Sequence, residues 1–193
     1  IGRIDTDYTY PLMKETFRYG NLAEEGGHAD HFTQYNLSAS RARESFARVA
    51  KQLIREEQYD KALEMLDRGL EVLPSPKIRY SDANTYPFIE GYYSLEEWEK
   101  GDELLQNYLQ TLIEYIEYYL QFDGMQATLV GDIIQDKMDS LMELYYLAAY
   151  AQRAEIVGAM NDYLRTFGYT DEELIQPDTD PAEMIDASTI DME

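Results

Sequence analysis

The stretch that decides the fold is REEQYDKALEMLDRGLEVLPS, residues 55–75. Its apolar residues recur at helical spacing until Pro74, which indicates a turn followed by a helix. Within that helix, Ala62 and Gly69 lie seven residues apart among large apolar residues. A glycine inside a helix costs about 1 kcal/mol relative to alanine. We therefore expect another helix to approach the backbone closely at these small residues.

The same stretch belongs to a longer pattern. Residues 43–76 follow the tetratricopeptide repeat, which is about 34 residues long, without a gap. The matching positions are Phe46, Val49, Ala50, Leu53, Tyr59, Ala62, Leu66, Gly69 and Pro74.

Two further helix pairs follow the first. A looser copy downstream repeats the spacing with Trp98, Gly101, Leu105 and Tyr108. A third, alanine-rich pair over residues 148–158 gives no clean alignment. Three pairs are about what such an array needs to be stable. The sequence predicts an all-α fold, a short right-handed array of antiparallel helix pairs resembling tetratricopeptide repeats.

Caps and glycines place the remaining elements. An N-terminal helix is expected from the N-cap Asp7 to Gly20, with Pro11 in its first turn, and residues 21–37 read as a loop. Ser94 and Glu97 form a capping-box pattern that predicts the start of a long helix. After a turn at 56–60, one expected helix carries Ala62 to Leu73. The other expected helices cover 40–56, 86–93, 95–122, 133–152 and 154–167, with a break at 123–132 and a turn capped by Thr170 and Glu173. The predicted regions are 1–37 packed on the array, 38–168 as the array, and 169–193 as a turn and acidic tail.

Composition limits the function. The 193 residues carry a formal charge of −22, which argues against nucleic acid as a partner, because phosphate binding needs clustered Lys and Arg. The chain has no cysteine, so disulfides, thiol nucleophiles and cysteine zinc sites are excluded. No apolar run approaches the roughly 18 residues of a membrane span, so we expect no membrane insertion of this chain. No cofactor is predicted.

Four segments form a recognisable set: GRIDTDYTYPLMKETFRYGN (2–21), SFARVAKQLIREEQYDKALEMLD (45–67), the Leu-Pro stop at 73–74 and GYYSLEEWEKGDELLQ (91–106). This set resembles the soluble C-terminal region of a family of bacterial multi-pass membrane proteins, a domain of unknown function related to transmembrane protein O-mannosyltransferases. The likeness covers roughly residues 2–165, and FRYGN (17–21) is its most distinctive part. The GGHADHF loop (26–32) and the acidic tail depart from the family pattern.

The resemblance implies a non-catalytic accessory domain of a membrane glycosyltransferase-like protein. Members of that class keep catalysis in the membrane-embedded part, so no catalytic residue carries over to this chain. The implied partner is that membrane-embedded part, another protein or a peptide. The implied location is extracytoplasmic, on the periplasmic side.

Three patterns suggest chemistry of their own. His28, Asp30 and His31 offer metal-ligand types, but nothing completes a site, so an ordinary polar loop is favoured and no metal is predicted. The tail DTDPAEMID (178–186) lacks the glycine and closing Glu of a calcium loop. Paired acids could serve a hydrolase, yet most mark helix N-termini. These pairs are Glu24–Glu25, Glu56–Glu57, Glu96–Glu97 and Glu172–Glu173.

A binding surface is predicted on the inner face of the first pair. The repeat alignment displays Glu44, Ala47, Lys51 and Ile54 there. The aromatic residues, among them Tyr92, Tyr93 and Trp98, are expected mainly to fill grooves between helices. Tyr118 is the one expected to be exposed, because it lies off the apolar stripe of its helix. A carbohydrate-binding domain remains the alternative function, and a carboxylate-dependent hydrolase a weaker one.

Overall fold

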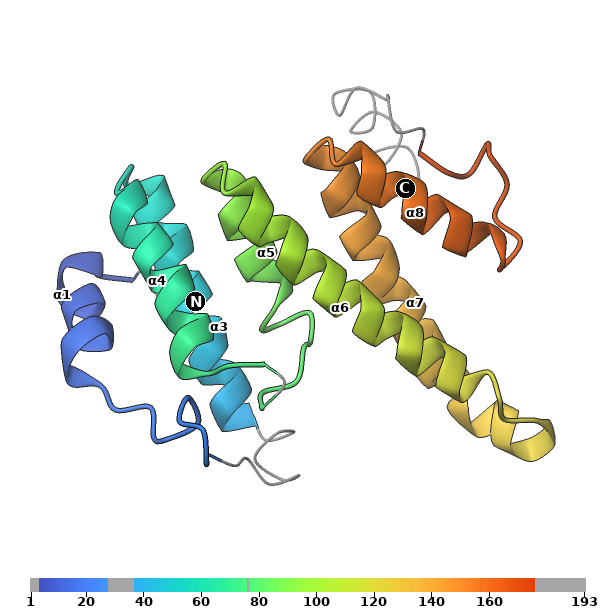
Figure 1. The fold of residues 1–193 in the computed structure, drawn as a ribbon, viewed down its shortest axis with the longest axis horizontal. Coiled ribbons are helices and arrows are strands. Elements are labelled where there is room, and N and C mark those ends of the chain that lie inside the picture. The colour runs from blue at the N-terminus through green and yellow to red at the C-terminus, as the bar shows by residue number, and fades with distance from the viewer. Residues whose placement is uncertain (1–3, 28–36, 76, 176–193) are drawn as a thin grey trace. The chain divides into compact units, whose positions relative to one another are not determined.

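The computed structural model describes residues 4–27, 37–75 and 77–175, and every regular element in these ranges is a helix (Figure 1). The all-α prediction is confirmed for this part of the chain. The elements are α1 (Thr6–Pro11), the π-helical turn η1 (Leu12–Thr16), α3 (Leu37–Arg55), α4 (Tyr59–Val72), α5 (Tyr86–Ser94), α6 (Trp98–Tyr119), α7 (Gly124–Tyr150) and α8 (Ala154–Arg165).

The chain forms two compact units, residues 1–108 and 109–193, and α6 runs through the boundary between them. The first unit contains α1, η1, α3, α4, α5 and the start of α6. The second contains the rest of α6 with α7 and α8. The predicted division at residues 37 and 168 stays a prediction.

In the first unit, helices meet at Gly69. A Cβ atom added to this glycine would lie 2.9 Å from Phe46 Cβ of α3 and 2.9 Å from Phe88 Cζ of α5. Ala50 and Ala62 are fully buried. The expected close approach at the small residues is therefore present, and α3, α4 and α5 pack together there.

Three turns share one backbone geometry. Glu57, Glu96 and Gln152 each adopt a left-handed conformation, with φ of 59°, 60° and 56°. In each turn this residue donates its N–H to the carbonyl three residues back, and the next residue donates to the carbonyl five back, which is the Schellman arrangement. The bonds are Glu57 to Ile54 (3.0 Å), Gln58 to Leu53 (2.9 Å), Glu96 to Tyr93 (3.1 Å), Glu97 to Tyr92 (2.9 Å), Gln152 to Ala149 (2.9 Å) and Arg153 to Ala148 (2.9 Å).

The equal turns define three helix pairs: α3–α4, α5–α6 and α7–α8. The second helices of these pairs begin at Tyr59, Trp98 and Ala154. Three residues beyond those starts stand Ala62, Gly101 and Val157, all buried. The third pair does not align by sequence alone, but its turn has the same geometry as the other two and therefore identifies it.

The N-terminal helix differs from the prediction. Its N-cap is Asp5, whose side chain accepts from the Tyr8 N–H at 3.2 Å, and not Asp7. Pro11 ends α1 instead of lying in its first turn. Proline has no N–H and its ring crowds the carbonyl four residues back, which fits the change to π-helical bonding in η1. The helical segment stops at Thr16, before Gly20.

Two other boundary predictions are wrong. Ser94 ends α5 and donates to the Glu90 carbonyl at 2.8 Å, so it does not cap α6, which begins at Trp98 after the left-handed Glu96. The expected break at 123–132 lies instead at 120–123, because α6 ends at Tyr119 and α7 begins at Gly124 and continues through Gly131. A single exposed glycine costs a helix only about 1 kcal/mol, which a 27-residue helix tolerates.

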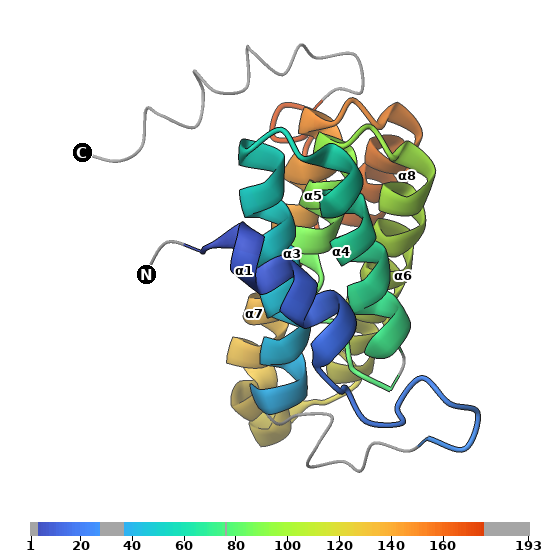
Figure 2. The ribbon, with the colours of Figure 1, turned by 90° about the vertical axis from the view of Figure 1, so that its left-hand side faces the viewer.

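The N-terminal segment packs across the first helix pair (Figure 2). Thr6 of α1 donates to Glu56 at the α3–α4 turn, and Tyr19 lies against Phe46 with ring centroids 5.1 Å apart. In the second unit, the buried Tyr145 of α7 donates to Asn161 of α8 at 2.6 Å. The Ile175 N–H donates to the Tyr145 hydroxyl at 2.6 Å, which fixes the segment after α8. The predicted Thr170–Glu173 cap is present, with the Thr170 N–H donating to Glu173 at 2.8 Å.

Candidate functional site

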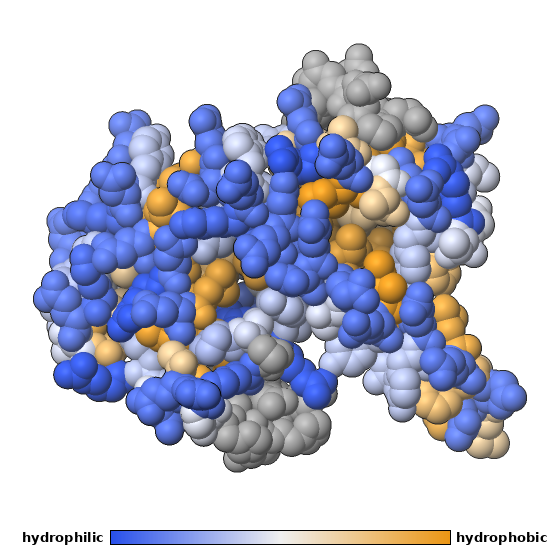
Figure 3. Space-filling view, viewed as in Figure 1, coloured by the Kyte–Doolittle hydropathy of each residue, from blue (hydrophilic) through white to orange (hydrophobic). Residues whose placement is uncertain are grey.

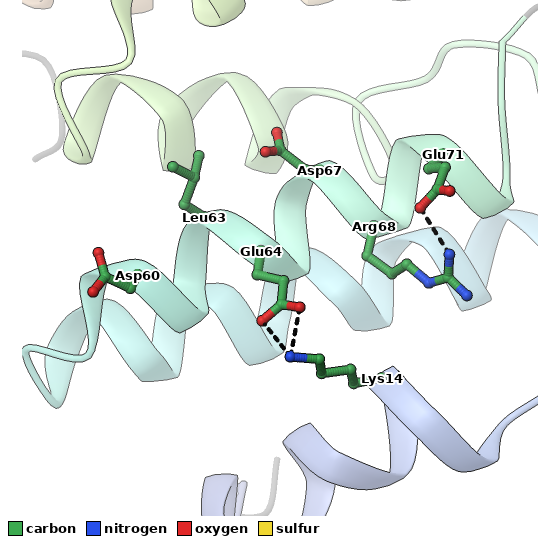
Figure 4. Close-up of a pocket in the computed structure, with 7 residues that line it drawn as sticks. All are labelled: Lys14, Asp60, Leu63, Glu64, Asp67, Arg68 and Glu71. Atoms are coloured by element: carbon green, nitrogen blue, oxygen red, sulfur yellow. Dashed lines mark hydrogen bonds and ion pairs between the residues drawn. The ribbon is translucent and has the colours of Figure 1, made fainter.

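A groove of about 490 Å³ runs along the exposed face of α4 in the first unit (Figure 4). One of its lining residues, Leu63, is apolar, and the others are charged. Glu64 and Lys14 point toward one another, whereas Leu63 and Asp67 point away from Lys14 (Figure 4). The lining residues are Lys14, Asp60, Leu63, Glu64, Asp67, Arg68 and Glu71.

The acidic side of the groove comes from the sequence of α4 itself. Asp60, Glu64, Asp67 and Glu71 are spaced four, three and four residues apart, which places all four carboxyl groups on one helix face. The opposite face carries the buried Ala62, Met65, Leu66 and Gly69 that pack against α3 and α5.

The cation opposite Glu64 comes from a distant segment. Lys14 Nζ lies 2.7 Å from a Glu64 carboxylate oxygen, and Tyr10 also donates its hydroxyl to Glu64. These hydrogen bonds, that of Lys14 first, lower the pKa of Glu64 below its usual value. The hydrogen bond to Glu64 in turn raises the pKa of Lys14. The N-terminal segment is thereby tied to α4.

The other carboxylates of the groove are also largely engaged. Lys100 of α6 lies 2.8 Å from Asp67, and the Tyr92 hydroxyl donates to the same carboxylate at 3.0 Å. Burial, reinforced by the charge of Asp67, raises the pKa of Tyr92 far above its ordinary value. Arg68 pairs with Glu71 at 2.7 Å.

This arrangement suits recognition of charged groups better than proton transfer. A general acid in a glycosidase needs a carboxyl group whose pKa is raised. Glu64, the groove carboxyl with a shifted pKa, is shifted in the other direction. The paired cations also hold the carboxylates in fixed positions, which suits a surface that discriminates among charged partners.

The predicted binding residues of α3 lie elsewhere in the same unit. Glu44 and Ile54 are half-buried, and Lys51 is exposed and pairs with Glu90 of α5 at 2.9 Å. Ala47 is only 2% exposed, so the prediction that it is displayed is wrong. Its methyl group is part of the core between helices.

Tyr118 lies in the other unit and is 55% exposed, as expected from its position off the apolar stripe. Its ring contacts those of Tyr119 and Phe122, at centroid distances of 5.2 Å and 5.5 Å. Tyr92 and Tyr93 are buried, which confirms that these two fill space between helices, whereas Trp98 is 39% exposed.

Arg43 of α3 is an unusual core residue, because its side chain is fully buried. Its Nε donates to the Leu73 carbonyl at 3.1 Å and its Nη2 donates to the same oxygen, next to the end of α4. Burial lowers the pKa of this guanidinium to about 10. Arg43 thus satisfies a carbonyl that the end of α4 leaves without a helical partner.

Several predicted features lie outside the described residues, namely His28, Asp30, His31 and the tail from residue 176. Within the described ranges, no group of three or more His, Asp or Glu side chains is arranged to hold a metal ion. In those ranges there is also no helix that combines the length and the apolar character needed to cross a membrane.

The groove itself was not predicted from the sequence. The spacing of the four acids on α4 was a signal for its acidic side. Lys14 could not be assigned to it, because 50 residues separate Lys14 from Glu64 in the chain. Comparisons of the chain with protein-family models, with curated proteins and with solved structures give no match.

Proposed function

We propose that this chain is a non-catalytic interaction domain, a tetratricopeptide-like right-handed array serving a membrane glycosyltransferase-like protein. The observation that carries the proposal is the repeated unit: three helix pairs joined by turns with the same left-handed residue and hydrogen bonds. Arrays of helix pairs present long surfaces to polypeptide partners. The link to a glycosyltransferase-like protein rests on the resemblance of residues 2–165 alone.

The α4 groove supports a polypeptide as the partner. It combines the apolar Leu63 with charged lining residues, and Asp60 among them has no ion-pair partner among the described residues. The partner would be the membrane-embedded part of the same protein, another protein or a peptide. On this proposal the domain lies on the periplasmic side.

The test is a retention experiment on the protein as the cell makes it. A protease site is inserted before Ile1, the protein is solubilised in detergent and cut, and the two parts are separated by affinity to the membrane part. We expect the domain to stay bound. Release of the domain would contradict a stable contact with the membrane part. Turnover of a sugar donor by the isolated chain would contradict a non-catalytic role.

One observation favours a second candidate, a carbohydrate-binding domain. The exposed Tyr118 ring, supported by Tyr119 and Phe122, offers an aromatic face of the kind that stacks on sugars. Screening the chain on a glycan array tests this, with Tyr118→Ala as the variant that should lose binding. Equal binding by the variant would exclude this ring as the sugar site.

A further inference from the structure

The first half of α7 carries an exposed apolar stripe, which we define as Met125, Leu129 and Ile133. Their side chains are 82%, 73% and 38% exposed. Spacing of four residues places them on one helix face over about 12 Å. Farther along the same helix, Leu141, Leu144 and Tyr145 are fully buried. The α7 stripe is therefore the uncovered part of a helix whose other half belongs to the core.

A further apolar side chain is exposed in the turn that precedes α7. Leu120, just before α7, is 51% exposed. Hydrophobic side chains gather over this end of α6 and α7 in the space-filling view (Figure 3). Apolar side chains gathered at one end of a surface often mark a binding site, because leaving them in water is unfavourable.

The charges around the stripe restrict what can cover it. Between Lys100 and Lys137 the sequence contains no lysine or arginine. The same stretch of the second unit carries Glu114, Glu117, Asp123, Asp132 and Asp136, of which Asp136 pairs with Lys137 at 2.6 Å.

Three occupants are disfavoured by these like charges. A second copy of the chain would bring the same acids against each other. The segment 176–193 of this chain is also acidic and contains no lysine or arginine. An anionic membrane surface would repel the carboxylates in the same way. A partner with apolar residues flanked by basic residues would cover the stripe and pair with the acids around it.

We propose that the α7 stripe docks an amphipathic, lysine- or arginine-rich helix of another protein. A helix lying along α7 would place its own apolar residues, at spacings of three and four, against Met125, Leu129 and Ile133. Its basic residues would face Asp132 and the acids near it. This inference deepens the proposed interaction function and rests on it, but it concerns a surface separate from the α4 groove.

The probe is a fluorescently labelled model peptide of about five helical turns, with leucine on one face and lysine elsewhere. A second peptide carries glutamate in place of lysine. Binding to the full chain is followed by fluorescence anisotropy. We expect the lysine peptide to bind about tenfold or more tightly than the glutamate peptide. Raising the salt from about 50 to about 500 mM should weaken binding severalfold, because salt screens the charges.

The triple variant Met125→Gln, Leu129→Gln, Ile133→Gln should weaken binding of the lysine peptide about tenfold or more. The matched control is Tyr146→Gln, Tyr150→Gln, which removes exposed aromatic rings from the same helix and should change binding by less than about twofold. A second variant, Asp123→Lys with Asp132→Lys, keeps the apolar stripe. It should weaken binding of the lysine peptide and strengthen binding of the glutamate peptide.

The proposal is overturned if neither peptide binds, if both bind equally, or if the triple variant binds as the wild type does. Stripe-dependent binding to phosphatidylserine-containing vesicles, in place of the peptide, would assign the surface to a membrane. Stripe-dependent dimerisation would assign it to a second copy. Retention of the domain without peptide binding would overturn this inference alone, whereas release of the domain with peptide binding would overturn only the proposed contact with the membrane part.

Discussion

At Gly69 the absence of a side chain lets three helices meet. The position faces Phe46 from α3 and Phe88 from α5, and any Cβ would stand closer to both than side chains normally approach. The conformational cost of glycine in a helix is thus offset by packing that only a hydrogen atom permits. The same logic applies at Gly101, where an added Cβ would lie 2.5 Å from Tyr93 Cε1.

Gly69→Val should destabilise the chain by about 1–3 kcal/mol, because the added methyl groups must displace Phe46 or Phe88. The measurement is urea unfolding followed by circular dichroism. The matched control is Gly131→Ala in α7, where nothing lies within 4 Å of an added Cβ. That control should gain about 0.5–1 kcal/mol from helix propensity. An unchanged midpoint for Gly69→Val would mean that the helices do not meet at this glycine.

Glu64 gives a pH-dependent prediction. Hydrogen bonds from Lys14 and Tyr10 lower its pKa in the folded state below the unfolded value of 4.5. Its contribution to stability is therefore complete above the unfolded pKa and is lost as the pH falls through the folded pKa. Since Lys14 and Glu64 are 39% and 41% exposed, solvent screens the pair and we expect its contribution to stability to be small.

The experiment compares Glu64→Gln with the wild type by urea unfolding at several pH values. The difference in free energy of unfolding should be present at neutral pH and should close as the pH falls below 4.5 and through the lowered pKa of Glu64. In a chain that already carries Lys14→Met, Glu64→Gln should change the free energy of unfolding at neutral pH much less. A double-mutant cycle measures this. A difference that grows in acid would show that the sign of the coupling is wrong.

At the scale of elements, the three left-handed turns explain how the helix pairs form. Each turn reverses the chain within two or three residues and satisfies the carbonyls at the end of the preceding helix. None of the three uses glycine at the left-handed position, although glycine is the residue that fits it best. The turns are therefore held by the packing of their helices, at some local conformational cost.

Replacing Glu57, Glu96 or Gln152 by glycine should stabilise the chain by about 0.5–1 kcal/mol each, because glycine adopts the left-handed conformation without steric cost. The greater entropy that glycine gives the unfolded chain offsets only part of this gain. The control is Gln106→Gly at an exposed position inside α6, which should lose about 1 kcal/mol. Thermal unfolding of the four variants measures both effects. Destabilisation by all three turn substitutions would contradict the left-handed geometry.

At the scale of the whole molecule, charge dominates. A formal charge of −22 on 193 residues keeps the chain dispersed but makes the compact state repel itself. Surface ion pairs such as Lys51–Glu90 and Arg68–Glu71 offset only a small part of this repulsion, because exposed pairs contribute little.

Adding about 0.5 M sodium chloride should therefore raise the melting temperature by a few degrees, since it shortens the screening length to about 4 Å. Differential scanning calorimetry measures the shift. Potassium chloride at the same ionic strength should give the same rise, because screening depends on ionic strength and not on the cation. A fall in melting temperature would mean that attractive ion pairs outweigh the net repulsion.

Helical periodicity was enough to predict the all-α class and most helices, because it depends on short-range spacing. The close approach at Gly69 followed for the same reason. The predicted helix boundaries were wrong where one local signal competed with another. Ser94 resembles an N-cap, and the glycines at 124 and 131 resemble a break. Packing along the rest of α7 overrides the weak preference of an isolated glycine.

The sequence by itself determined the helical class, the small-residue contact of the first pair, the acidic surface and the exposure of Tyr118. Each depends on composition or on residues close in the chain. Only the tertiary structure decided that Lys14 and Lys100 meet the acids of α4, that Arg43 is buried against the end of α4, and that half of α7 stays uncovered. These features join residues tens of positions apart, and local spacing carries no information on which distant side chains will meet.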